Sequence, residues 1–136
     1  MESRALSRVR WLLDSNAVMG YLNQDPAPGF ATRMESLFAE GSAISVITVI
    51  EVLGWRGHSE QSRADAQRLL AGLSLIGLTP SVVDRTIVLR SLLSIALPDA
   101  VIAASALEEG MCLVTRNVQD FDRVDGLALD NPFVLG

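Results

Sequence analysis

The chain has 136 residues, a formal net charge of −5 and a hydrophobic fraction of 49%. This length suits one domain, and no Pro/Gly/Ser-rich stretch divides it, so we expect a single domain over 1–136. Every apolar run is shorter than the roughly 18 residues of a membrane-spanning helix, and the first residues lack the apolar segment of a secretory signal. We therefore expect a cytoplasmic protein.

The charged residues exclude several classes of function. All eleven basic residues are arginine, and a phosphate-binding P-loop needs a lysine. The acidic balance argues against broad electrostatic binding of nucleic acid, so any such binding must be local. Cys112 is the only cysteine, which excludes an intramolecular disulfide and a thiol-based metal cluster.

The first half of the chain predicts two passages from a strand into a helix. Apolar spacing predicts a strand at 9–13, a helix resuming at 17–23, a helix at 30–38 closed by Gly41, a strand at 43–47 and a helix from 48 to 55. In both passages a polar residue follows the strand directly or within about one helical turn.

The second half continues the alternation. We expect a helix at 60–73, a short strand at 75–78, a helix at 81–96, a buried helix from Pro98 to a stop at Gly110, a strand at 111–114, a polar turn at 115–120 and an edge strand at 127–129. Strands that alternate with helices favour an α/β fold with a mostly parallel sheet covered on both faces.

Acidic and amide side chains follow the predicted strands. Asp14, Glu51 and Asn117 each lie at or about one turn past a strand's carboxyl end, where α/β folds place their functional crevice. Asp99, at a helix start, can join them. Such an all-oxygen set suits Mg²⁺ or Mn²⁺. Without a metal, mutual repulsion should raise the pKa of at least one of these carboxyls.

Each acid also has an ordinary structural interpretation. Asp14 or Asn16 can cap the helix that follows, and Thr48 with Glu51 has the T-x-x-E spacing of a capping box. Asp99 can serve the helix dipole. Only the joint placement of these residues after successive strands favours a functional site.

Other polar and aromatic residues receive weaker interpretations. Asn117 with Asp120 can shape a turn, and Arg116 beside the crevice can contact a phosphate or form a salt bridge. Trp11 and Trp55 are interpreted as core residues rather than base-stacking platforms. His58, in the polar tract 54–62, is interpreted as solvated and is given no role.

Four segments together resemble a known family. WLLDSNAV, SVITVIEVLGW, LPDAVIAASALEEG and LVTRNVQDF occur in the order found in PIN-domain ribonucleases, and specifically in the VapC-type toxins of bacterial toxin–antitoxin pairs. The resemblance spans nearly the whole chain. Each motif is weak alone, but their joint occurrence is specific.

The resemblance implies roles for particular residues. Asp14, Glu51 and Asp99 would be the acidic metal-site residues, and Asn16 and Thr115 would support them through hydrogen bonds. Asn117 stands where many relatives have a fourth acid, and this departure puts a second metal position in doubt. Asp120 is the nearest carboxylate that can substitute for it.

The resemblance further implies a three-layer α/β/α sandwich, Mg²⁺ or Mn²⁺ dependence, cleavage of RNA, homodimers and inhibition by a small antitoxin. The apolar surplus independently suggests a homodimer, formed through the helices at 30–40, 60–73 or 81–96. Two alternatives stay open. One is a non-toxic PIN nuclease of RNA processing or decay. The other is a catalytically idle binding module, an alternative that stays open because Asn117 replaces the fourth acid of many relatives.

Overall fold

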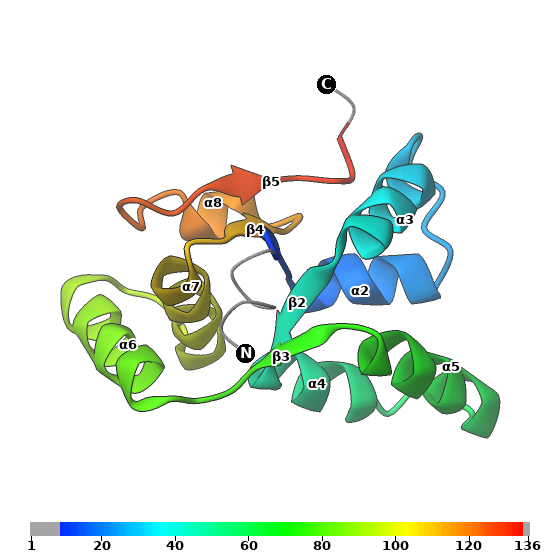
Figure 1. Cartoon of the computed structure of the whole chain (residues 1–136), viewed down its shortest axis with the longest axis horizontal. Helices are drawn as coiled ribbons and strands as arrows, with labels where there is room; N and C mark the ends of the chain where they lie inside the picture. Colours follow the sequence, from blue (N-terminus) through cyan, green and yellow to red (C-terminus); the bar gives the residue numbers. More distant parts are fainter. Residues whose placement is uncertain (1–8, 135–136) are drawn as a thin grey trace.

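The computed structural model describes residues 9–134, in which a parallel sheet forms the centre of the molecule (Figure 1). The strand order is β3-β2-β1-β4-β5, and every neighbouring pair is parallel. The strands are β1 (Trp11–Leu13), β2 (Ser42–Ser45), β3 (Ser74–Ile76), β4 (Cys112–Val114) and β5 (Leu129–Asp130). Residues 1–8, on which the secretory-signal prediction depends, lie outside the described part.

Helices cover both faces of this sheet. They are α2 (Ser15–Leu22), α3 (Phe30–Glu40), α4 (Val46–Leu53), α5 (Glu60–Ala71), α6 (Pro80–Leu92), α7 (Leu97–Glu109) and α8 (Val118–Phe121). Figure 1 shows α6 and α7 on one side of the strands, with α2, α3, α4 and α5 on the other. Among residues 9–134, none of these helices has the length and hydropathy needed to cross a membrane.

The alternation of side chains along the strands explains why there are two cores. Leu12 and Leu113 belong to one buried cluster with the helices α6 and α7, while Leu13 and Val114 belong to a second cluster with α2, α3 and α5. A sheet that buries apolar residues on both faces needs a helical layer on each side. The predicted three-layer α/β/α architecture is confirmed.

The boundaries of several elements differ from the sequence prediction. The strand expected at 43–47 ends at Ser45, whose hydroxyl accepts a hydrogen bond from the Ile47 amide and thereby starts α4 two residues early. The helix expected at 81–96 stops at Leu92, because the backbone is extended at Leu93; the Arg90 guanidinium donates to the Ile95 carbonyl in the segment that follows. The polar turn at 115–120 contains the short helix α8.

Two predictions about the segment after α4 are wrong. Trp55 is 42% exposed and is not a core residue. His58 is half-buried rather than solvated: its Nε2 lies 2.7 Å from the Val52 carbonyl oxygen, and its Nδ1 lies 2.9 Å from Ser62 Oγ. The imidazole therefore joins the end of α4 to the first turn of α5.

Candidate active site

Asp14 is the most enclosed acid at the carboxyl edge of the sheet. Its amide continues the β1–β4 pairing by donating to the Val114 carbonyl, and its Oδ1 accepts from the Ser15 amide at 2.8 Å, which caps α2. The side chain is 4% exposed. The capping interpretation is therefore correct, and it still leaves the carboxylate at the place where the crevice was expected.

Two side chains hold the second oxygen of Asp14. Thr115 Oγ1 donates to Asp14 Oδ2 at 2.7 Å, and Asn16 Nδ2 donates to the same oxygen at 3.0 Å. Asn16 Oδ1 in turn accepts from the Arg116 amide, while Thr115 Oγ1 accepts from the Asn117 amide. These bonds fix the segment after β4 against the start of α2, so the orientation of the Asp14 carboxylate is set by both segments.

Glu51 lies on the exposed side of α4 and is held by a residue from another element. Ser15 Oγ donates to Glu51 Oε1 at 2.6 Å and also lies 3.2 Å from Thr48 Oγ1. The capping-box alternative is wrong, because the helix is capped by Ser45 and Thr48 is a buried residue inside it. The Glu51 carboxylate is thus turned toward the Asp14 segment and not toward its own backbone.

Asp99 occupies the first turn of α7 and is half-buried. Burial raises its pKa above the ordinary 3.8, and the negative charges of Asp14, Asp120 and Glu51 raise it further. The pKa of Asp14 is also raised, chiefly by burial; the hydrogen bond from Thr115 opposes this, and the charge of Glu51 adds to it. The expected repulsion among the acids is therefore present, and Asp120 takes part in it.

The remaining predicted residues lie on α8 and the turn before it. Asn117 is exposed and precedes α8, and Asp120 is in the first turn of that helix. Arg116 forms an ion pair with Asp25 at 3.0 Å, and its guanidinium lies 3.8 Å from the centre of the Phe133 ring. Of the two interpretations given to Arg116, the structure has the salt bridge.

The side chains at this edge of the sheet offer carboxylate, amide and hydroxyl oxygens, which are the ligand atoms that hard divalent cations prefer. Within residues 9–134, however, no three His, Cys, Asp or Glu side chains stand close enough to hold a metal ion. Like charges without a cation between them favour separated positions, and Glu51 is bonded to Ser15. The residues fit a cation by their chemistry, and closing on it requires the exposed carboxylates to move inward.

Ser15 is the site residue that sequence reasoning missed. It stands between Asp14 and Asn16, but a serine at the first position of a helix is common, and its spacing gives no sign of the partner on α4. Only the crossing of α2 and α4 brings its hydroxyl to Glu51.

Comparison with known proteins agrees with this fold. Residues 11–127 match the family model described as PIN domain. No curated protein sequence matches the chain.

Three solved structures resemble the chain over most of its length. VapBC2 from Rickettsia felis, bound to a DNA fragment from its promoter, is 26% identical with a TM-score of 0.78, and the match covers 90% of this chain and 98% of that one. A toxin-antitoxin complex from Klebsiella pneumoniae is 26% identical with a TM-score of 0.73, covering 91% and 98%. FitAcB from Neisseria gonorrhoeae is 27% identical with a TM-score of 0.71, covering 92% and 99%.

Proposed function

Because the chain belongs to the PIN-domain family, we propose that it is a metal-dependent endoribonuclease, and that it acts in the cytoplasm as the toxin of a toxin–antitoxin pair. Its similarity to VapBC2 and to the Klebsiella toxin-antitoxin complex supports the second part of this proposal. The similarity covers nearly the whole length of both chains.

The observation that carries the nuclease proposal is the convergence of acids that no arginine neutralises. The charge of Glu51 raises the pKa of Asp14, and the charges of Asp14, Asp120 and Glu51 raise the pKa of Asp99. Among the described residues none of these four acids forms an ion pair. Unpaired acids repel one another and oppose folding, so their presence at one edge needs a positively charged ligand to account for it.

Asp14, Glu51 and Asp99 would hold Mg²⁺ or Mn²⁺, with Asn117 or Asp120 completing the site. When bound, such an ion lowers the pKa of a coordinated water and offsets charge on the scissile phosphate. Thr115 and Asn16 hold the Asp14 carboxylate by hydrogen bonds, and the Ser15 hydroxyl orients the Glu51 carboxylate. No protein nucleophile is required, because the carboxylates align water and phosphate.

The proposal is tested by incubating the purified chain with total cellular RNA in the presence of Mg²⁺, Mn²⁺ or EDTA. We expect cleavage with either metal and none with EDTA. A chain that binds neither metal nor RNA would instead be the catalytically idle module, and the nuclease proposal would be wrong.

The toxin role is tested separately. We expect a neighbouring reading frame to encode a small DNA-binding antitoxin that copurifies with this chain, blocks its nuclease activity and relieves growth arrest. An arginine of that antitoxin would neutralise the acids. Cleavage without any such partner or growth arrest would favour a nuclease of RNA processing or decay. We also propose a homodimer, which light scattering of the isolated chain tests.

A further inference from the structure

The turn between α4 and α5, which begins three residues after Glu51, presents a tryptophan and an arginine to solvent. Trp55 is 42% exposed, and Arg56 is exposed as well. Within residues 9–134, four arginines form ion pairs, and Arg56 is one of five that form none. An indole and an unpaired guanidinium are thus available to a ligand at adjacent positions.

The turn holds the indole in a defined place. The six-membered ring of Trp55 packs on Gly57 so closely that an added Cβ would lie 2.3 Å from Cζ2 and would displace the ring. The His58 ring meets the indole edge-on with centroids 5.1 Å apart. His58 is itself anchored at both ring nitrogens, by the Val52 carbonyl and the Ser62 hydroxyl. The exposed ring surface is therefore preorganised for contact.

This surface is close to Glu51, one of the proposed metal-site acids. Trp55 follows Glu51 by four residues and lies just past α4, which ends at Leu53. The Trp55 amide bonds to the Val52 carbonyl, so the chain turns tightly here and keeps Trp55 near Glu51. A substrate whose phosphate meets Glu51 has a neighbouring nucleotide within reach of this turn.

We propose that Trp55 and Arg56 form a contact site for single-stranded RNA, in which Trp55 stacks on a base near the cleaved bond and Arg56 binds a backbone phosphate. An aromatic face next to a cation is the combination that holds single strands without strong sequence preference. In a chain with net charge −5, an unpaired arginine near Glu51 supplies a local attraction for phosphate that the net charge does not provide. This inference rests on the proposed ribonuclease function.

The first test measures binding of a short fluorescein-labelled oligoadenylate, with Ca²⁺ in place of Mg²⁺ to neutralise the carboxylates. Trp55→Ala should raise Kd by between about fivefold and a hundredfold, the range for loss of one stacked base. Trp55→Phe, which keeps a flat ring, should recover most of the affinity. The control Ile87→Ala, also at an exposed apolar position but on α6, should bind as the wild type does.

The arginine has its own control. Arg56→Gln should flatten the dependence of log K on log salt by about 0.7, as expected for one lost contact to a single strand. Arg63→Gln removes an equally exposed charge on α5 and should leave the slope unchanged.

A spectroscopic measurement covers the case in which Trp55→Ala disturbs the fold. The chain has two tryptophans, so Trp11→Phe leaves Trp55 as the only indole, and its fluorescence should be quenched when the oligonucleotide binds.

The outcomes separate this inference from the function on which it rests. If wild-type protein binds and cleaves RNA but Trp55→Ala does both equally well, the contact site is wrong and the nuclease stands. If wild-type protein binds no RNA, both are wrong. If Trp55→Ala weakens only a complex with the antitoxin, the surface binds protein and the proposal fails.

Discussion

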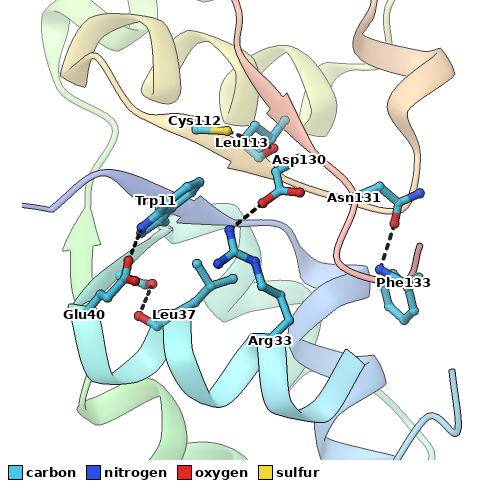
Figure 2. Close-up of polar contacts among 10 residues, drawn as sticks. Trp11, Arg33, Leu37, Glu40, Cys112, Leu113, Asp130, Asn131 and Phe133 are labelled. Atoms are coloured by element: carbon cyan, nitrogen blue, oxygen red, sulfur yellow. Dashed lines mark hydrogen bonds and ion pairs between the residues drawn. The ribbon is translucent and has the colours of Figure 1, made fainter. Parts of the chain in front are cut away.

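Two aspartates at the same edge of the sheet have opposite surroundings. Asp130, in β5, forms an ion pair with Arg33 at 2.7 Å, and that guanidinium also lies 5.0 Å from the centre of the Trp11 ring (Figure 2). Asp14, directly after β1, is more deeply buried and yet is bound only by neutral donors. Position after a parallel strand therefore does not make an acid functional.

The two regions differ in whether the negative charge of the aspartate is neutralised by a positive side chain. Around Asp130 the charge is neutralised within the fold, which gives modest stability and leaves nothing for a ligand to do. Around Asp14 the neutral donors orient the carboxylate but leave its charge intact, and Glu51, Asp99 and Asp120 add to the field. Uncompensated charge costs stability, and a bound cation would recover it.

The largest effect should come from Asp99→Asn. This change removes one charge from the acidic group and keeps a side chain that suits a first helical turn, so we expect the fold to persist. RNA cleavage should fall by more than about a hundredfold, beyond the loss typical of residues that only support metal ligands. A steady-state cleavage assay measures this, and unchanged cleavage with tight Mn²⁺ binding would remove Asp99 from the site.

Ser15→Ala should reduce kcat by about tenfold to a hundredfold, as expected when a residue that orients a metal ligand is lost. Ser15→Thr keeps the hydroxyl and should restore most of the rate, a rescue that a purely structural role for Ser15 would not give. Ser91→Ala removes a hydroxyl that bonds only to the Val88 carbonyl on α6, and it should have wild-type kinetics. Equal rates for Ser15→Ala and Ser91→Ala would contradict the positioning role.

Asn117→Asp should strengthen Mn²⁺ binding by about tenfold, because a carboxylate binds a hard cation better than an amide does. Calorimetric titration measures the affinity. If affinity is unchanged in this variant but falls in Asp120→Asn, then Asp120 completes the site.

The Arg33–Asp130 pair should behave as a structural pair only. Arg33→Gln should lower the free energy of unfolding by about 0.5–1 kcal/mol, the range for partly exposed ion pairs, and should leave RNA cleavage unchanged. Urea denaturation gives the first quantity. A loss of cleavage well beyond that of Arg68→Gln, which breaks another exposed pair, would show that the two regions are coupled.

The smallest expected effect is on the pH dependence of stability without metal. The native pKa values of Asp14 and Asp99 lie above 3.8, so between 3.8 and those raised values the native state binds more protons than the unfolded state. Their contribution to stability therefore falls as pH rises through this window. At pH values above this window, the free energy of unfolding of Asp99→Asn should exceed that of the wild type by a few tenths of a kcal/mol to about 1 kcal/mol. At pH values below the window, the two should be equal.

Denaturation at several pH values, with EDTA and with Mg²⁺, measures this gain. Mg²⁺ should reduce it, because the ion binds the wild-type acids more tightly than the variant, which has one carboxylate fewer. A gain that is the same at every pH would exclude relief of charge repulsion as its cause.

The sequence by itself determined the layers of the fold and pointed to the acids that we propose for the site. Short apolar runs alternating with amphipathic helices favour a parallel sheet covered on both faces, and local spacing is sufficient to place Asp14 at its carboxyl edge and Asp99 in a first helical turn. These features depend on residues close together in the chain, so they are readable from it. The start of α4 at Val46 was missed because it depends on a cap by the Ser45 hydroxyl that competes with the apolar spacing. The stop of α6 at Leu92 was missed because the apolar pattern continues beyond Leu93, where the backbone becomes extended.

Only the tertiary structure decided which charges are compensated. Arg33 and Asp130 are 97 positions apart, and Ser15 and Glu51 are 36 apart, so their pairings follow from how α3 meets β5 and how α2 meets α4. The same holds for Trp55, whose apolar character suggested the core but whose place in a turn on Gly57 leaves it exposed. The sequence shows which chemical groups are present, but their burial and their partners depend on how the chain packs. Burial and partners decide whether a charged or aromatic group stabilises the fold or remains available to a ligand.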